Sequence, residues 1–327
     1  MVEQELPTQP QQASPQYIGR FAPSPSGPLH FGSLVSAVAS YLDAKSEGGI
    51  WLVRMEDLDP PREIPGAANE ILNSLDAHGL HWDGDILYQS QRNSAYLDAI
   101  KFLQQQGLLY PCYCTRKAVA AQGNIYLGKC RDKTDPLAFL KQDLSLVKES
   151  EKASALRLKV SDLGDRYKNI PTTINFSDIF FGEQAFDLKK ESGDFIVRRK
   201  DRLFAYQLAV VVDDIFQGIT HVIRGSDLLD STPQQLFLFQ LLAATPPRFG
   251  HVPVATNDRG QKLSKQHGAT SISDKDAELN LKRALKFLGQ TLPDTDDQLK
   301  VSELLTWACK HWNRKNIPQT MAIPVKE

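Results

Sequence analysis

The sequence predicts an α/β fold with a doubly wound parallel sheet. This prediction rests on a pattern of strand, turn and helix that occurs twice in the chain. Residues 17–22 form a short apolar run ahead of a segment with helical spacing, and a second apolar run follows at residues 50–57. The same order of strand, turn and helix returns at residues 221–244. A strand–helix–strand crossover joins parallel neighbours, so the two units predict a parallel sheet covered by helices.

The predicted helices are defined by their spacing and by the residues at their ends. The first helix starts after Gly32 and stops at Gly48 and Gly49. One of its faces is apolar: Leu34, Val35, Val38, Tyr41 and Leu42. In the second unit we expect Thr232 at the N-cap and Pro233 at the first helical position.

Two segments depart from the alternating pattern. Residues 112–195 contain three of the cysteines and a strand-like run at 155–160, which indicates an insertion. From residue 271 the spacing is helical, with Leu281, Leu285 and Leu288 ahead of Gly289, which indicates a small C-terminal helical domain. We therefore expect five parts along the chain: a disordered arm at 1–16, the first half of a Rossmann-type domain at 17–111, the insertion at 112–195, the second half of the Rossmann-type domain at 196–270, and a helical region at 271–327.

Composition limits the possible partners. A chain of 327 residues with 41% apolar and 24% charged residues is typical of a globular protein with its own core. The formal charge of −1 gives no overall basic field, so a nucleic acid would have to be held by local patches. The sequence contains no apolar run of about 18 residues and no secretory pattern at its start. We expect a cytoplasmic monomer with no membrane partner.

The stretch RFAPSPSGPLHFGSL, residues 20–34, has the features of a phosphate-binding loop. It follows a predicted strand and precedes a helix, where ligands bind in doubly wound sheets. The free N–H groups of the helix start form an anion site, Gly27 and Gly32 permit close approach of the backbone, and His30 offers another donor. Taken alone, a proline-stiffened turn with a surface histidine is the more common interpretation.

A second loop, DRGQKLSKQHGA at residues 258–269, adds two lysines, Lys262 and Lys265. Ammonium groups beside a phosphate loop stabilise the negative charge that develops on a departing pyrophosphate. Alone, this loop is equally well explained as a solvated surface loop. Together, the two loops indicate a polyphosphate site.

Both loops resemble the paired signatures of class I aminoacyl-tRNA synthetases. HFGS at residues 30–33 is similar to the HIGH motif, and KLSKQ at residues 262–266 is similar to the KMSKS motif. The blocks RMEDLD, FIVRRKD, FAYQLAVVVDD and HVIRGSDLLDSTPQQ extend the resemblance to the glutamyl branch over about residues 17–271. The departures are Ser33, at the second histidine of HIGH, together with Leu263 and Gln266.

The resemblance narrows further because only about 60 residues follow the lysine loop, too few for an anticodon-reading domain. The chain is similar to the truncated glutamyl-Q tRNA(Asp) synthetases. The resemblance implies ATP- and Mg²⁺-dependent activation of L-glutamate and its transfer to the queuosine base at the wobble position of tRNA(Asp). The alternatives are a small glutamyl-tRNA synthetase that charges the tRNA(Glu) 3′ end, a nucleotidylyltransferase and a non-catalytic tRNA-binding module.

The resemblance also assigns site residues. It implies that six residues line the glutamate site: Arg20, Ala22, Ser24, Glu56, Tyr206 and Arg224. It implies that five contact ATP: His30, Gly32, Ser33, Lys262 and Lys265, with His30 and Lys265 as the main catalytic groups. From position alone, Arg20, Glu56 and Arg224 fall at the carboxyl ends of predicted strands. Surface ion pairing of Arg20 and Glu56 and core packing of Tyr206 remain equally open on that basis.

The cysteines of the insertion suggest a structural zinc site. Cys112, Cys114 and Cys130 supply three thiolates, and a structural site needs four ligands. The pattern alone leaves Asp132 or a water as the fourth, whereas the resemblance implies Tyr126. This zinc would fix an insertion that approaches the RNA. We expect Cys309 to be a buried apolar thiol.

Two basic clusters are candidate contacts for RNA phosphates. They are the run at Arg198–Arg202 and the pair Lys189 and Lys190. A run of charge is more often a solvated face, so this prediction rests on composition alone.

Overall fold

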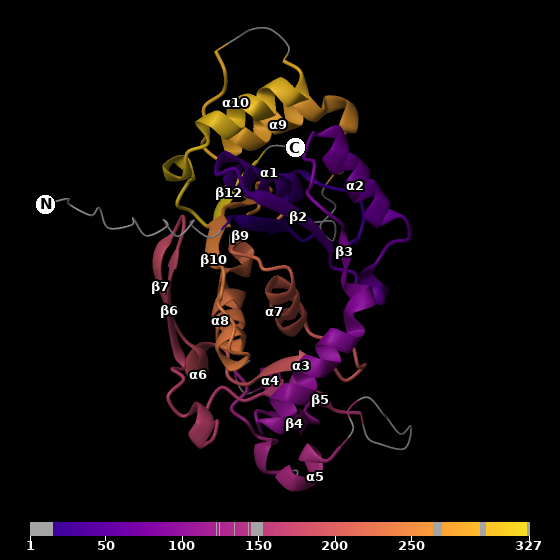
Figure 1. The fold of residues 1–327 in the computed structure, drawn as a ribbon, viewed down its shortest axis with the longest axis vertical. Helices are drawn as coiled ribbons and strands as arrows, with labels where there is room; N and C mark the ends of the chain where they lie inside the picture. The colour runs from indigo at the N-terminus through magenta and orange to yellow at the C-terminus, as the bar shows by residue number, and fades with distance from the viewer. Residues whose placement is uncertain are drawn as a thin grey trace, which may run out of the picture.

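The computed structural model describes residues 16–121, 123, 125–133, 135–142, 144, 153–263, 270–294 and 299–325. Its centre is parallel sheet, as predicted (Figure 1). One parallel sheet has the order β1 (Ile18–Phe21), β2 (Ile50–Met55), β3 (Leu87–Tyr88). A second parallel pair joins β9 (His221–Gly225) to β10 (Arg248–Val252).

The two parallel sets lie next to each other. The amide of Thr220, just ahead of β9, donates to the carbonyl of Ile18 in β1 at 2.9 Å. The spatial order is therefore β3, β2, β1, β9, β10, the order of a doubly wound sheet. Its topological switch point lies between β1 and β9, where such sheets bind ligands.

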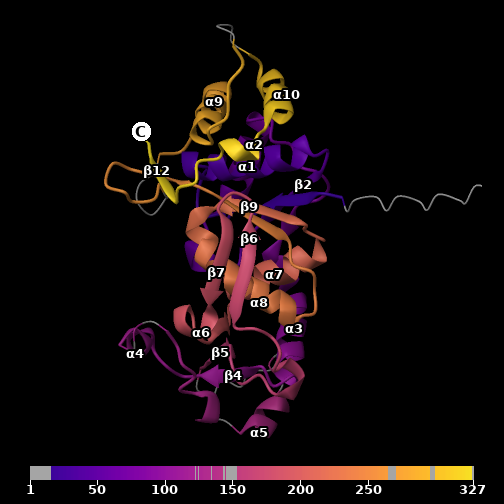
Figure 2. The ribbon, with the colours of Figure 1, turned by 90° about the vertical axis from the view of Figure 1, so that its left-hand side faces the viewer.

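Helices cover both faces of this sheet (Figures 1 and 2). One side has α1 (Phe31–Ser46), α9 (Ala277–Phe287) and α10 (Val301–His311), with α2 (Ala67–Ala77) beside them. The other has α7 (Tyr206–Phe216) and α8 (Thr232–Leu241), with α3 (Asn93–Gln105) leading away. The predicted apolar face of α1 is confirmed, and α1 is buried more widely than that face because α9 and α10 also cover it.

The starts of two helices differ from the prediction. Helix α1 begins at Phe31 rather than after Gly32, and His30 is its N-cap. Thr232 is the first residue of α8 and not its N-cap, because the chain is already helical in a 3₁₀ turn at Ser226–Ser231. The Thr232 hydroxyl instead accepts a hydrogen bond from Arg224.

The middle of the chain forms a separate antiparallel layer, at the lower end of Figure 1. Its sheet has the order β4 (Leu109–Cys112), β5 (Ala155–Leu158), β8 (Phe195–Arg198). A hairpin, β6 (Thr173–Asp178) and β7 (Gly182–Asp187), runs up to the parallel sheet, where the Ile179 amide donates to the Phe249 carbonyl in β10 at 2.8 Å. Three short helices complete the region: α4 (Arg116–Ala120), α5 (Pro136–Leu140) and α6 (Leu188–Glu191).

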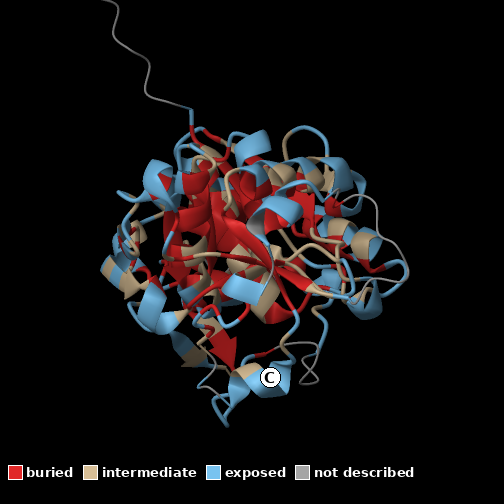
Figure 3. Cartoon of the chain, turned by 90° about the horizontal axis from the view of Figure 1, so that it is seen from below, coloured by how far each residue is buried: buried red, intermediate tan, exposed pale blue. Residues whose placement is uncertain are grey.

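The C-terminal helices share the core of the parallel sheet. Buried residues fill the centre of the molecule (Figure 3). Leu281, Leu285 and Leu304 belong to the same apolar cluster as α1 and β2. Cys309 packs against this cluster and is only half-buried, so the predicted fully buried thiol lies at its edge.

The last described strand also returns to the domain. Strand β12 (Ala322–Pro324) pairs in parallel with β11 (Val254–Thr256). Thr256 in turn forms a bridge with Lys262 in the lysine loop. Among the described helices, none is long and apolar enough to cross a membrane.

Asp43 in α1 joins the start and the end of the chain. It is fully buried and accepts from the Tyr17 hydroxyl at 2.6 Å, the Trp312 indole at 2.9 Å and the Arg314 guanidinium at 2.7 Å. Asp43→Asn puts an amide NH₂ among these donors. We expect the free energy of unfolding, measured by urea denaturation, to fall by about 3 kcal/mol. An unchanged denaturation midpoint would show that this cluster does not stabilise the fold.

Candidate active site

One large cavity opens off the carboxyl ends of the parallel strands and has a volume of about 1050 Å³. Every described residue that the sequence analysis assigns to the glutamate or ATP site lines it: Arg20, Ala22, Ser24, His30, Gly32, Ser33, Glu56, Tyr206, Arg224 and Lys262. Lys265 and Gln266 lie outside the described residues. The structure thus brings together residues that are more than half the chain apart.

The two predicted loops meet at this cavity. A Cβ built on Gly32 would lie 3.5 Å from the Leu263 carbonyl, so the backbones of the HFGS and KLSKQ segments are in contact. The Ile272 amide, beyond the second loop, donates to the Leu29 carbonyl at 3.1 Å. The Lys262 ammonium lies 2.5 Å from Asp227. A ligand that touches one loop therefore lies beside the other.

His30 organises the start of α1. Its Nδ1 accepts from the Ser33 amide at 3.2 Å, and its Nε2 lies 2.9 Å from the Ser33 hydroxyl. Ser33, which replaces the second histidine of the HIGH motif, is thus held by the first. The positive end of the α1 dipole faces the cavity, which favours an anion there.

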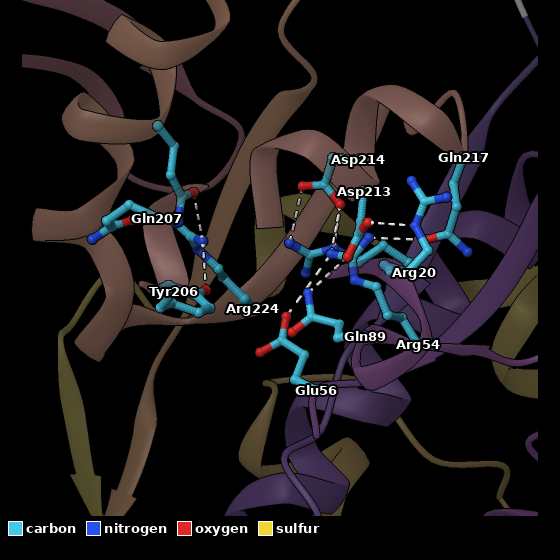
Figure 4. A network of polar contacts seen from close by, with 12 residues as sticks. Arg20, Arg54, Glu56, Gln89, Tyr206, Gln207, Asp213, Asp214, Gln217 and Arg224 are labelled. Carbon is cyan, nitrogen blue, oxygen red and sulfur yellow. Dashed lines mark hydrogen bonds and ion pairs between the residues drawn. The ribbon is translucent and has the colours of Figure 1, made fainter. Parts of the chain in front are cut away.

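A buried ion cluster holds Arg20 in place (Figure 4). Arg20 contacts Asp214 through Nε at 3.2 Å and Nη2 at 3.3 Å. Arg54 donates to the same carboxylate at 2.7 Å. Burial alone would raise the pKa of Asp214, but the two guanidinium groups lower it. Arg20 is only 4% exposed, so its interpretation as a surface ion pair is wrong.

Glu56 is a buried carboxyl group of the site that is only partly satisfied within the protein. Its side chain is 10% exposed, and its Oε1 has no hydrogen-bond partner. The nearest cation, Arg54 Nη2, lies 3.9 Å away. Burial raises the pKa of Glu56 to about 7, although Arg54 and Arg20 oppose the change. Near neutral pH both the protonated and the charged forms of Glu56 are populated. An added cation would favour the charged form.

Arg224 is bound by neutral acceptors only. Its five N–H groups donate to His251 Nε2, the Tyr206 hydroxyl, Gln235 Oε1, the Leu228 carbonyl and the Thr232 hydroxyl, at 2.8–3.3 Å. No carboxylate of the described residues forms an ion pair with it. Tyr206 lines the cavity beside it, so this side chain does more than fill the core.

Sequence reasoning missed the residues that support this site. Arg54 and Asp214 hold Arg20, and Asp178 and His251 lie behind Arg224. A signal was present for the first pair, since an arginine interrupts the apolar run of β2 and two acids end the run VVV in α7. Acids and cations within buried elements need partners, which predicts such a pairing.

The three cysteines of the middle region form a second candidate site. The sulfurs of Cys112, Cys114 and Cys130 lie within 4.8 Å of one another. The Tyr126 hydroxyl is 3.4 Å from Cys112 Sγ and 3.5 Å from Cys114 Sγ, and Asp132 is outside this group. Burial opposes ionisation of Cys130, but hydrogen bonds with Tyr126 and the backbone lower its pKa to about 7. This donor set fits a metal ion.

The candidate RNA-binding cations are partly engaged within the protein. Arg199 lines the cavity and lies 3.3 Å from Asp59 and 2.6 Å from Asp201. Arg198 donates to the Leu144 carbonyl at 2.8 Å. Lys189 and Lys190 remain exposed on α6.

Comparisons with known proteins agree with this geometry. The family "tRNA synthetases class I (E and Q), catalytic domain" matches residues 18–304. Two proteins named glutamyl-Q tRNA(Asp) synthetase are similar: that of Pseudomonas fluorescens is 47% identical over 95% of this chain and 97% of its own, and that of Thiobacillus denitrificans is 49% identical over 92% and 95%.

Among solved structures, a glutamate-tRNA synthetase from Elizabethkingia anophelis superposes with a TM-score of 0.73 at 22% identity, over 95% of this chain and 68% of that one. At that identity the likeness concerns the fold. Since the matched region covers both loops and the whole parallel sheet, the chain belongs to the glutamate and glutamine family of class I tRNA synthetases.

Proposed function

We propose that this chain activates L-glutamate with ATP and transfers the glutamyl group to the queuosine base at the wobble position of tRNA(Asp). One observation carries the proposal: the HFGS loop, Lys262, Glu56 and Arg224 line the same cavity. The names of relatives that match along nearly their whole length support the choice of acceptor.

The chemistry needs positioning and charge stabilisation rather than a protein nucleophile. The glutamate α-carboxylate attacks the α-phosphorus of ATP, and pyrophosphate leaves with the electron pair of the broken P–O bond. We propose that the start of α1, His30, Lys262 and Lys265 bind the phosphates, and the lining of the cavity by His30 and Lys262 supports this assignment. Mg²⁺ carried by ATP neutralises phosphate charge during this step.

The amino-acid end of the cavity suits a substrate with two carboxylates and one ammonium. Arg224 offers a positive charge that no carboxylate of the described residues neutralises by contact. Glu56 offers a carboxyl oxygen without a partner, which suits the ammonium group. The second step is attack by a hydroxyl of the queuosine diol on the glutamyl carbonyl, with AMP as the leaving group and the hydroxyl proton passed to solvent or phosphate.

The first experiment measures amino-acid-dependent ATP–pyrophosphate exchange and then acyl transfer. We expect exchange with glutamate and none with aspartate or glutamine. We expect transfer to tRNA(Asp) that contains queuosine, and none to the same tRNA lacking queuosine. Transfer to the 3′ end of tRNA(Glu) would instead identify a glutamyl-tRNA synthetase, and exchange that ignores glutamate would identify a nucleotidylyltransferase.

Glu56→Gln tests the role of this carboxyl group. Because its pKa is raised from 4.5 to about 7, the folded state holds an extra proton between these values, and stability is lost as the pH rises through that window. The variant should match the native protein at pH 4 and exceed its free energy of unfolding by about 3 kcal/mol at pH 8.

The same variant should need about tenfold more glutamate for half-maximal exchange, since its amide cannot pair with the ammonium. Glu70→Gln, on the exposed side of α2, is the control for both measurements. The difference in free energy of unfolding between Glu56→Gln and the native protein should grow in favour of the variant from pH 4 to pH 8. If this difference instead shifts in favour of the native protein, the pKa of Glu56 is not raised.

We propose that the cysteine site holds one structural zinc, with Tyr126 as the fourth ligand, and that it stabilises the region that meets the RNA. Metal analysis should find about one zinc per chain. Cys114→Ser should lose the zinc while glutamate-dependent exchange persists, because the cysteines do not line the active-site cavity. Cys309→Ser is the matched control and should keep the metal; a native protein whose four thiols all titrate freely would refute the site.

A further inference from the structure

Behind Arg224, away from the cavity, lies a chain of three buried polar groups contributed by different strands. Asp178 ends β6, His251 lies in β10 and Arg224 lies in β9. The Asp178 carboxylate is 2.6 Å from His251 Nδ1, and Arg224 Nε donates to His251 Nε2 at 3.0 Å. The side chains of Asp178 and His251 have no exposed surface. Burying two titratable side chains costs solvation free energy, which indicates that this pair has a role in the structure or the site.

The hydrogen bonds of this chain fix where the imidazole proton lies. Asp178 accepts, so His251 carries its proton on Nδ1 and presents a lone pair at Nε2. Arg224 Nε can only donate, which agrees with that arrangement. The Thr232 hydroxyl, 3.3 Å from Nε2, accepts from Arg224 and is free to donate to the same lone pair. With the other tautomer, N–H would face N–H in a buried site.

The contrast with Arg20 shows what this arrangement achieves. Arg20 touches Asp214 directly, so its charge is neutralised within the protein. Arg224 is oriented by a carboxylate too, but a neutral imidazole stands between them. The guanidinium is held in one plane, and its charge remains uncompensated by contact. An acid in direct contact would instead compete with the carboxylate of a ligand.

We infer that Asp178 and His251 are positioning residues, which hold Arg224 in the orientation that binds a carboxylate of the amino-acid substrate. Because all five of its N–H groups donate within the protein, the carboxylate must replace one acceptor. The Tyr206 hydroxyl, the longest contact at 3.3 Å and part of the cavity wall, is the one that we expect it to replace. The inference deepens the proposed function and rests on it. Asp178 also has a structural role, since its Oδ1 accepts from the amides of Phe180 and Phe181 in the hairpin turn. The test must therefore separate orientation of Arg224 from support of the turn.

Asp178→Asn makes that separation. The Asn oxygen can still accept from the turn amides, but its NH₂ now donates to His251 Nδ1 and moves the imidazole proton to Nε2, against Arg224 Nε–H. We expect the KM for glutamate in pyrophosphate exchange to rise about tenfold or more, with the KM for ATP changed by less than about twofold. An unchanged glutamate KM in a folded variant would overturn the inference.

His251 provides a second pair of variants that leaves the turn carboxylate intact. His251→Gln can accept from Arg224 and donate to Asp178, so its glutamate KM should stay within about threefold of the native value. His251→Leu has the bulk without the hydrogen bonds and should resemble Asp178→Asn. Equal effects of the two replacements would contradict a positioning role. This comparison decides the matter if Asp178→Asn does not fold.

Asp43→Asn is the matched control, because it removes a buried carboxylate that does not line the cavity. Asp43→Asn should lower the stability of the fold and leave the KM for glutamate unchanged. If it raised this KM as much as Asp178→Asn does, general destabilisation would explain both variants and the inference would fail. The ¹⁵N shifts of the His251 ring give a readout without glutamate: the proton on Nδ1 in the native protein, and on Nε2 in Asp178→Asn. If the native protein showed no glutamate-dependent pyrophosphate exchange but had the His251 proton on Nδ1, only the proposed function would be refuted. If the native protein had this proton on Nε2, the inference would be refuted.

Discussion

The architecture of the site depends on one carboxylate, that of Asp214, which two buried arginines share. Arg20 is the last residue but one of β1, Arg54 belongs to β2, and Asp214 lies on α7 beneath the sheet. Each charge would be costly to bury alone, so the three are stable only as a group. The group therefore fixes the carboxyl ends of two strands against a helix from the other half of the chain. The cavity opens above this contact.

This constraint explains why the site has two arginines with different surroundings. Arg20 is neutralised within the protein by Asp214, whereas Arg224 is surrounded by neutral acceptors and forms no ion pair with a carboxylate of the described residues. Between them, burial raises the pKa of Glu56 to about 7, and a bound ammonium would favour the charged form of this group. The cavity thus carries electrostatic features that a substrate with both carboxylate and ammonium groups would complement. The end of the cavity that we propose for the phosphates is simpler, since a helix terminus and the lysine loop form it.

Sequence reasoning predicted the sheet, α1 and the gathering of the two loops, because these depend on local periodicity and on the crossover rule. It misplaced the starts of α1 and α8, where capping depends on neighbours: His30 caps with its ring, and the 3₁₀ turn before Thr232 extends the helix backwards. It could not predict that Asp178 supports Arg224, because the hairpin that brings them together has no periodic link to β9. Residues that act through another side chain leave little trace in a pattern.

The pairing of β11 with β12 makes the last described strand part of the lysine loop's foundation. Thr256 contacts Lys262 on one side and Pro324 on the other, and the Val325 amide donates to the Thr256 carbonyl at 2.9 Å. An affinity tag fused behind β12, or a protease that trims it, would therefore disturb the lysine loop from a distance.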